Sequence, residues 1–282
     1  MVEFIETTTF SVAVISTSSM SATLITFGTS PITKVRSCVA IPNFRYSPSM
    51  ARRYRGDFIG DVIKIMEQIL SLVLPSTVQT LQMVFFSTVF ALLVGFPLGV
   101  LLSITNPYGI TPKPVFNLIL SRIIDVFRSF PFVILMIVLL PFTRFVLGTS
   151  IGTTATIIPL SIAAAPFVAR ITETALNEVD PGMIQAARAM GSTNWQIIYK
   201  VLIPEALPSV VSGITLTVIT LVSYSAMAGT LGGGGLGDLA IRYGYQRFRT
   251  GVMVVSVIVI IIMVALIQLV GTKIANKMMS KR

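Results

Sequence analysis

Residues 185–191 read Gln-Ala-Ala-Arg-Ala-Met-Gly and, after nine intervening residues, residues 201–204 read Val-Leu-Ile-Pro. This polar interval lies between strongly apolar segments of the chain. A helix, a glycine break and a second short helix form a compact knob when they interrupt a membrane protein. Such a knob suits docking into a groove of another protein.

The ends of the two short helices are marked by capping residues. Asp180-Pro181 is typical of a helix N-terminus, and Gly191 can end that helix in the left-handed conformation, with a positive φ. Thr193 and Gln196 have the spacing of a capping box for the second helix. We expect this second helix to stop before Pro204.

The composition places the chain in a lipid bilayer. Of its 282 residues, 54% are hydrophobic and 11% are charged, whereas a soluble domain carries about 25% charged residues. Five apolar runs are each near the ~20 residues that a helix needs to cross the hydrocarbon core; they are residues 76–104, 129–147, 153–171, 208–231 and 251–271. The sequence therefore predicts an all-α integral membrane protein with five transmembrane helices.

The net charge of +10 is dispersed between apolar runs, so it does not indicate a nucleic-acid partner. Basic residues of short loops favour the cytoplasmic side. With the 180–204 loop inside, ten basic residues of the membrane part lie in the cytoplasm and four lie outside, which predicts a cytoplasmic C-terminus. One cysteine, Cys38, and no histidine leave no Cys/His metal site.

The first 65 residues differ from the rest. They are rich in Ser and Thr, and their basic residues would lie outside, against the orientation rule. We interpret residues 1–65 as an extension that is non-native or disordered, with the native protein starting at Met66 and a transmembrane domain at 66–282. A weaker alternative is a sixth span at about residues 10–29.

Three further patterns predict packing and turns. Gly95 and Gly99 have the spacing that lets two membrane helices approach closely. Arg122, Asp125 and Arg128 recur on one face of an expected interfacial helix, 114–128, where we expect them to pair with one another. The glycine run at 232–237 lacks the Lys-Ser/Thr of a phosphate-binding loop and is expected to be a flexible external re-entry of the chain.

The 180–204 loop also carries apolar side chains. We expect them to form one contact surface that needs a protein partner or the membrane surface; they are Met183, Ile184, Ala187, Met190, Trp195 and Ile198.

The loop spacing resembles the signature cytoplasmic loop of bacterial ABC-importer permeases. From about residue 66 the chain is also similar to the methionine-importer subfamily, in segments 127–132, 141–144, 148–152, 165–170 and 224–229. The resemblance implies the five-helix type I permease fold in the bacterial inner membrane and a homodimer with two ATP-binding cassette subunits, which carry ATP and Mg. It also implies a substrate-binding lipoprotein or periplasmic protein. The residues it assigns to ATPase coupling are Gln185, Ala186, Ala187, Gly191, Trp195 and Pro204; the family usually has Glu where this chain has Gln185.

The resulting interpretation is a permease subunit for methionine uptake, with no catalytic residues, metal or cofactor of its own. A permease for another small amino acid is the alternative. An ion-coupled carrier is a further one, although the five runs contain no Asp, Glu or His. Small polar and soft apolar groups of the fourth run are candidates for the substrate pathway; they are Ser223, Tyr224, Ser225 and Met227.

Overall fold

The computed structural model describes residues 11–15, 22–26 and 48–280, and the chain divides into a unit of residues 1–61 and a unit of residues 62–282. In the first unit, strand β1 (Ser11–Ile15) pairs antiparallel with strand β2 (Ala22–Thr26). The described part of the 10–29 stretch is therefore not a helix, and the alternative of a sixth span is wrong there. The expectation of an all-α chain holds for the described residues of the second unit. Cys38 lies outside the described residues.

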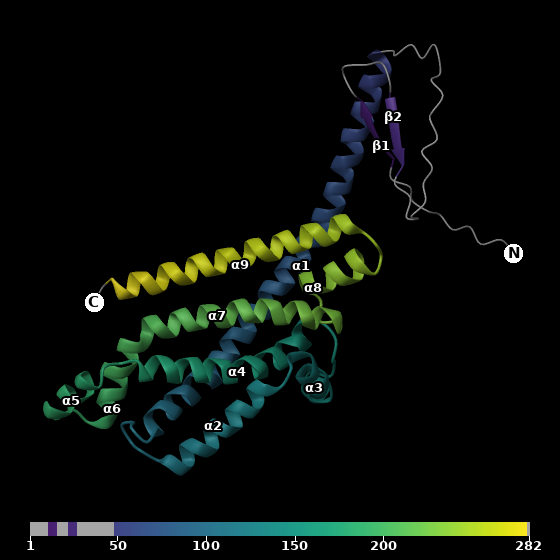
Figure 1. The fold of residues 1–282 in the computed structure, drawn as a ribbon. Coiled ribbons are helices and arrows are strands. Elements are labelled where there is room, and N and C mark those ends of the chain that lie inside the picture. Colours follow the sequence, from purple (N-terminus) through teal and green to yellow (C-terminus); the bar gives the residue numbers. More distant parts are fainter. Residues whose placement is uncertain (1–10, 16–21, 27–47, 281–282) are drawn as a thin grey trace. The chain divides into compact units, whose positions relative to one another are not determined.

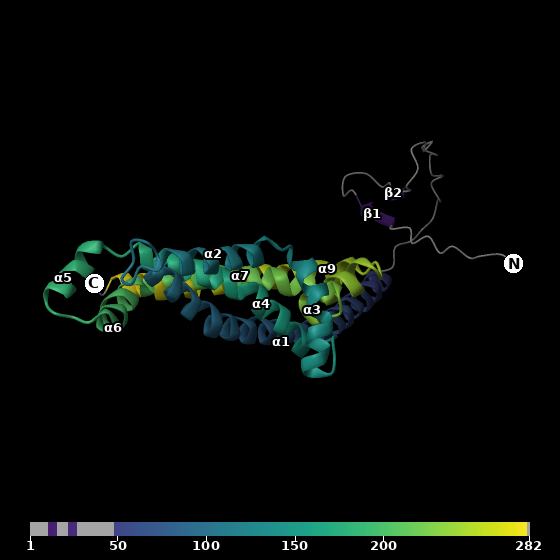
Figure 2. The same ribbon diagram turned by 90° about the horizontal axis from the view of Figure 1, so that it is seen from below.

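Helices account for the regular structure of residues 48–280. They are α1 (Pro48–Thr105), α2 (Pro114–Ser129), α3 (Phe132–Leu147), α4 (Thr153–Asn177), α5 (Pro181–Ala189), α6 (Asn194–Ile197), α7 (Ile203–Thr230), α8 (Gly235–Asp238) and α9 (Thr250–Met279), with π-helices η1 (Ile198–Leu202) and η2 (Leu239–Tyr245). Helices α4, α7 and α9 run along a common direction, with α5, α6 and the C-terminus at one end and α8 at the other (Figures 1 and 2).

Four helical stretches are long and apolar enough to cross a membrane: Ile69–Thr105, Thr153–Asn177, Asn194–Thr230 and Thr250–Met279. The sequence predicts an interfacial helix at 114–128 and a span at 129–147, and the structure has α2 and α3 at these places, as a pair bent by 102°. Helix α3 has 16 residues and is too short to count as a span by itself. The chain has five spans when this pair counts as one. Phe130 has an extended backbone with ψ 128°, as favoured for a residue before a proline, and this ends α2. With 16 residues, α3 is about 24 Å long and lies across the direction of α4 and α7 (Figure 2).

Helix α1 packs closely against α4 through Gly95 and Gly99, which confirms the predicted contact. A Cβ atom at Gly95 would lie 2.5 Å from the carbonyl oxygen of Ala165, and one at Gly99 would lie 2.5 Å from that of Ala169. In a bilayer, apolar burial drives helix association weakly, so close packing of small residues contributes much of the stability. The two glycines therefore set the distance between the helices.

The glycine run at 232–237 packs against α1, so the expectation of a flexible re-entry is wrong. The backbone N–H of Gly235 donates to Oε1 of Gln79 at 3.0 Å, and that of Leu236 donates to Oγ1 of Thr80 at 2.9 Å. Leu236 is fully buried beside Met83 and Leu221 in the main core. Glycine here permits close approach of two backbones, which sequence composition does not distinguish from mobility.

Candidate functional site

The first short helix of the 180–204 loop, α5, begins as its sequence predicts. Asp180 is the N-cap, and its Oδ1 accepts a hydrogen bond from the N–H of Gly182 at 2.7 Å. Pro181 occupies the first turn, where its missing N–H costs no helical hydrogen bond. The start of α5 is therefore fixed by local chemistry alone.

Gly191 ends α5 in the left-handed conformation, with φ +80°, which confirms the predicted positive φ. Its N–H donates to the carbonyl of Arg188 at 2.9 Å, and the N–H of Ser192 donates to that of Ala187 at 3.1 Å. These two bonds form a Schellman motif, which satisfies carbonyls that the helix end leaves free. The glycine thereby sets the direction in which the chain leaves α5.

The second helix begins at the predicted capping box but does not stop before Pro204. The side chain of Thr193 accepts from the N–H of Gln196, and Oε1 of Gln196 accepts from the N–H of Thr193 at 2.9 Å. Helix α6 then continues through η1 into α7, so the expected stop is wrong. In η1, the N–H of Ile203 donates to the carbonyl of Ile198, five residues back. This wider turn directly precedes Pro204, where a regular α-turn would press the proline ring against a carbonyl.

The apolar side chains of the loop separate into two sets, so the single contact surface expected from the sequence is not formed. Ala187 and Ile198 are buried and pack with Leu176 of α4, and Ile184 packs against the same cluster. Met183, Met190 and Trp195 lie on the outside, with exposed fractions of 40%, 79% and 75%. Tyr199 joins them at 68%; the sequence analysis did not include it, although it directly follows Ile198 in the same loop.

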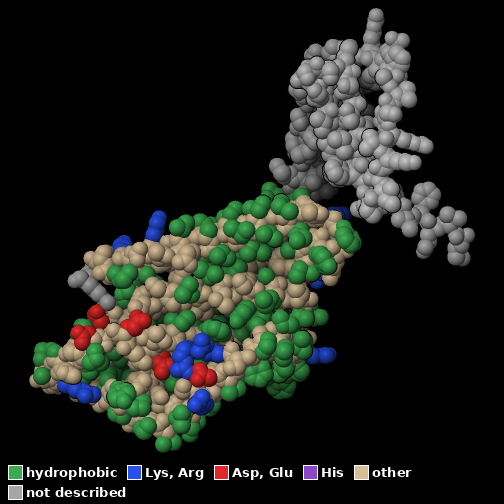
Figure 3. Space-filling view, in the orientation of Figure 1, with side chains coloured by type: hydrophobic (Ala, Val, Ile, Leu, Met, Phe, Trp, Pro, Cys, Tyr) green, Lys and Arg blue, Asp and Glu red, His purple; other side chains and the backbone are tan. Residues whose placement is uncertain are grey.

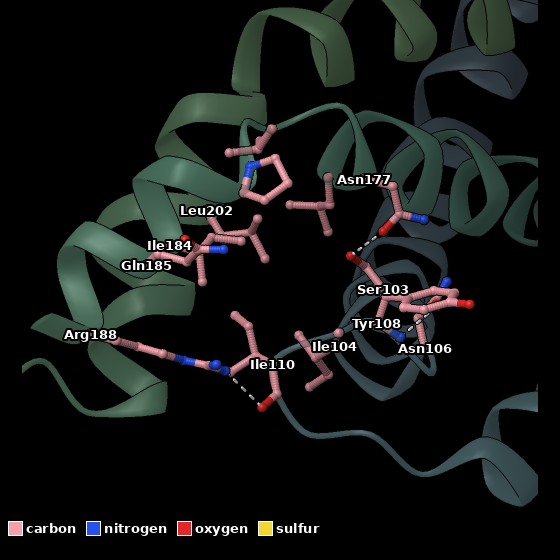
Figure 4. A pocket seen from close by; sticks show the side chains of 14 residues that line it. Ser103, Ile104, Asn106, Tyr108, Ile110, Asn177, Ile184, Gln185, Arg188 and Leu202 are labelled. Atoms are coloured by element: carbon pink, nitrogen blue, oxygen red, sulfur yellow. Dashed lines mark hydrogen bonds between the residues drawn. The ribbon is translucent and has the colours of Figure 1, made fainter.

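A cavity of about 370 Å³ separates α5 from the end of α1 and the connection that follows it (Figure 4). Gln185 and Arg188 line it, while Ala186 is exposed outside it. Across the cavity, Nη2 of Arg188 donates to the carbonyl of Ile110 at 3.2 Å, which ties the loop to the α1–α2 connection. Tyr108 on that connection is 98% exposed. The loop thus contacts α4 through its buried side chains and the α1–α2 connection through Arg188, while its tip is exposed.

The four pathway candidates do not share one face of α7. Ser223 and Met227 are exposed, whereas Ser225 is buried and its hydroxyl donates to the carbonyl of Val222 at 2.7 Å. Tyr224 stacks on Phe132 of α3, with ring centroids 4.5 Å apart. Within one chain, the structure therefore brings only Ser223 and Met227 together at the surface, and the pathway assignment stays a prediction.

Ser223 and Met227 belong to a longer surface that we name the α7 stripe. Its members recur at helical spacing, are exposed or half-buried, and are mostly hydroxyl-bearing: Ser209, Ser212, Leu216, Thr220, Ser223, Met227 and Thr230. The sequence analysis missed this stripe, although a search for polar residues at intervals of three and four in the fourth apolar run would have found it.

Asp125 of α2 has the expected partner on its own helix and a closer one on α4. Arg170 of α4 contacts Oδ1 of Asp125 at 2.5 Å and Oε2 of Glu173 at 2.7 Å, while Arg128 is 3.8 Å from Asp125. The expected pair of Asp125 and Arg128 is present, Asp125 pairs more closely with Arg170, and Arg122 has no ion pair with any of the described residues. Acidic and basic side chains gather over α2 and α4 on an otherwise largely apolar face (Figure 3). Among the described residues there is no group of three or more His, Cys, Asp or Glu side chains placed to hold a metal ion.

Comparisons with known protein families, sequences and structures agree with one another. Residues 95–279 match the family described as binding-protein-dependent transport system inner membrane component. The chain is 48% identical over 206 residues to the probable D-methionine transport system permease protein of Vibrio cholerae, covering 73% of this chain and 92% of that protein. It is 51% identical over 151 residues to the D-methionine transport system permease protein of Escherichia coli K12, covering 54% and 70%.

A solved structure of the MetNI methionine ABC transporter in inward-facing conformations has the same fold. A chain of that structure superposes with a TM-score of 0.74 at 45% identity, covering 75% of this chain and 98% of that chain. The chain described here belongs to the family of binding-protein-dependent transport system inner membrane components, the permease subunits of ABC importers.

Proposed function

We propose that the chain is the membrane-spanning permease subunit of an ATP-driven methionine importer and that it moves substrate by alternating access. The relatives named for D-methionine transport and the methionine transporter of the same fold support this substrate. A permease for another small amino acid is the remaining alternative. Family membership excludes the alternative of an ion-coupled carrier, because these permeases work in binding-protein-dependent systems.

The observation that carries the proposal is the exposed tip of the 180–204 loop. Met190, Trp195 and Tyr199 are large side chains that are exposed at the end of α5, on α6 and on η1. Aromatic residues and methionine are enriched at the centres of protein interfaces. We assign this tip to an ATP-binding cassette subunit, which supplies the ATP and Mg²⁺ chemistry.

The loop is built into the helix that carries the α7 stripe. Helices α6, η1 and α7 form one continuous stretch, Asn194–Thr230, so a displacement of the tip passes directly into α7. Movement of a docked partner would therefore reorient the stripe. This is the mechanical link that alternating access requires.

The α7 stripe supports a two-fold dimer. Thr220 and Thr230 donate to carbonyls of their own helix, but Ser209, Ser212 and Ser223 make no such bond among the described residues. These three hydroxyls would lack partners in lipid, which favours a protein surface or water beside them. A second copy of the chain presents the same stripe across a two-fold axis, and the pathway then lies between the two copies. A substrate-binding lipoprotein or periplasmic protein would deliver substrate at the end of the bundle where α8 lies.

The orientation follows from the same placement. The end of α9 lies at the end of the bundle that carries α5 and α6 (Figure 1). If a cytoplasmic ATPase binds the loop, the C-terminus is cytoplasmic, which agrees with the basic Lys273 and Lys277 near it. The protein then resides as a multi-pass permease in the bacterial inner membrane.

Reconstitution tests the proposal. The chain, co-purified with its cassette subunit and placed in vesicles with the binding protein, should accumulate labelled methionine only when ATP is supplied at the loop side. A cassette subunit that lacks its phosphate-loop lysine is the control. ATP-dependent uptake of another amino acid, without methionine, would assign the alternative substrate. Failure of the cassette subunit to co-purify would refute the permease role.

Cysteine labelling tests the pathway in the same vesicles. Ser223→Cys and Met227→Cys should react with water-soluble thiol reagents in a nucleotide-dependent way, because both side chains are exposed on α7. Ser225→Cys is the matched control, since that position is buried. Uniform protection of Ser223→Cys and Met227→Cys in every nucleotide state would count against a pathway along α7.

A further inference from the structure

A second cavity, of about 470 Å³, lies between α2, α4, α7 and the end of α9. Its walls carry two guanidinium groups, one carboxylate, two serine hydroxyls and several apolar side chains. We propose that this cavity binds a free α-amino acid as its zwitterion. Arg128 holds the carboxylate and Glu178 the ammonium group. The inference rests on the proposed transport function and names the place where substrate stands at the loop end of the pathway.

Arg128 is the cation available to a ligand. Its guanidinium lies 5.2 Å from the ring centroid of Phe167, which holds it in place through a cation–π contact without satisfying its donors. Its one ion-pair distance, to Asp125, is 3.8 Å, and 36% of its side chain is exposed. A guanidinium can bind a carboxylate with two parallel hydrogen bonds, which are stronger than neutral ones.

Arg170 is already engaged and provides the fixed part of the wall. Its guanidinium donates to Asp125, to Glu173 and to the hydroxyl of Ser121. Asp125 and Glu173 do not line the cavity. Oδ1 of Asp125 lies 2.5 Å from Nη2 of Arg170 and 3.8 Å from Nη1 of Arg128, so Asp125 pairs more closely with Arg170 and leaves donors of Arg128 for a ligand.

Glu178 provides the opposite charge. It is the C-cap residue of α4 and lines the same cavity. No ion pair joins it to any of the residues the structure describes. The C-terminal end of a helix carries partial negative charge, so the end of α4 adds to the attraction for an ammonium group.

The remaining walls suit the rest of an amino acid. Ser209 and Ser212 of the α7 stripe bring hydroxyls to the cavity, while Leu216 and Met279 contribute exposed apolar surface. Methionine side chains adapt to irregular apolar ligands. A site with both charges, hydroxyls and an apolar wall matches a zwitterion with an uncharged side chain better than it matches a simple anion.

The position of the cavity agrees with a role in translocation. Ser209, Ser212 and Leu216 are the members of the α7 stripe closest in sequence to the 180–204 loop. The cavity thus continues the stripe toward the end of the bundle where the loop lies. A substrate that follows the stripe reaches Arg128 and Glu178 last.

A site-specific protection experiment tests the proposal. Ser212→Cys is placed in a Cys38→Ser background, and the complex with its cassette subunit is held in nanodiscs of neutral phosphatidylcholine. The rate of modification by a charged methanethiosulfonate reagent is measured with and without L-methionine. At ten times a dissociation constant of about 1 mM, L-methionine should slow modification about tenfold. Methionine methyl ester, which lacks the carboxylate charge, should protect far less.

Variants separate the site from general effects. Arg128→Gln should abolish protection by L-methionine, and Glu178→Gln should weaken it. Arg122→Gln is the matched control, because Arg122 lies on the same helix but lines a different cavity. In this control, protection should be unchanged.

Several results would overturn the proposal. They are an absence of modification at Ser212→Cys in every state, equal protection in Arg128→Gln and in the parent, and loss of protection in Arg122→Gln. Protection by phosphatidylglycerol without methionine would assign the cavity to a lipid headgroup instead. If the same complex imports methionine but shows no protection, the inference fails and the proposed function stands. If the complex imports no methionine, the proposed function is wrong, and the inference that rests on it is wrong too.

Discussion

Replacement of Gly191 by valine tests whether the angle between α5 and α6 controls coupling to the ATPase. Gly191 has φ +80°, and no atom lies within 4 Å of the position that a Cβ would take. The cost of a side chain is therefore confined to the backbone conformation. We estimate it at about 1–2 kcal/mol, toward the upper end for a β-branched residue.

A penalty of this size shifts the loop away from its native angle. At 1.4 kcal/mol per factor of ten, about 2 kcal/mol corresponds to a roughly 30-fold change in the balance between native and altered loops. In the altered loop, the bonds from the N–H groups of Gly191 and Ser192 to the end of α5 are lost. Met190 and Trp195 then no longer present one surface to the partner.

The assay compares four forms of the permease with the same cassette subunit. Gly191→Val should weaken binding of the cassette subunit by up to about 30-fold, with substrate-stimulated hydrolysis falling in parallel. Gly191→Asn should have a smaller effect, because asparagine tolerates positive φ. Ser192→Val is the matched control: it places the same side chain one residue later, where φ is not positive. Membrane insertion and dimerisation should be normal in all forms.

Two results would refute this reasoning. Full binding and normal transport by Gly191→Val would show that the loop is not the coupling element. An equal defect in Ser192→Val would show that bulk, and not the backbone conformation, is what matters.

Three further changes have expected outcomes. Gln185→Glu should retain cassette binding and transport, because Gln185 is exposed beside Arg188 and the new carboxylate faces a cation; a loss of binding at equal expression would contradict this. Gly99→Val should lower the free energy of unfolding of the purified protein by about 1–3 kcal/mol, since its Cβ would meet the carbonyl of Ala169. An unchanged unfolding temperature would disprove the close contact. A protein starting at Met66 should insert and transport normally, and loss of assembly would show that residues 1–65 are needed.

Features set by local hydrogen bonding were predictable from the sequence. The N-cap at Asp180, the left-handed Gly191 and the capping box at Thr193 each depend on residues within a few positions of one another. Their free energies are local, so the residue pattern alone identifies them. The apolar runs likewise predicted the helical membrane unit, because their length is fixed by the bilayer.

Features that depend on distant residues were not predictable in this way. Asp125 pairs with Arg170, which is 45 positions away, and the sequence offers a nearer partner in Arg128. Pro204 normally predicts the end of a helix, but the π-turn before it lets the helix continue. The break between α2 and α3 lies at Phe130-Pro131, where the sequence places it, but the angle of 102° depends on how both helices pack against α4.

The π-turn before Pro204 joins the loop to α7, although the helix is not regular at this point. A proline and a wider turn leave fewer regular backbone hydrogen bonds between the loop and the bilayer part of α7, so this would be a weak point if it stood alone. Ile198 and Leu202 of this turn are buried in one cluster with Leu176 of α4. Packing against α4 thus stabilises the π-turn, and a displacement at Trp195 is transmitted to α4 as well as to α7. Because α4 carries Arg170 and α7 carries Ser212, a displaced loop moves two walls of the charged cavity at once.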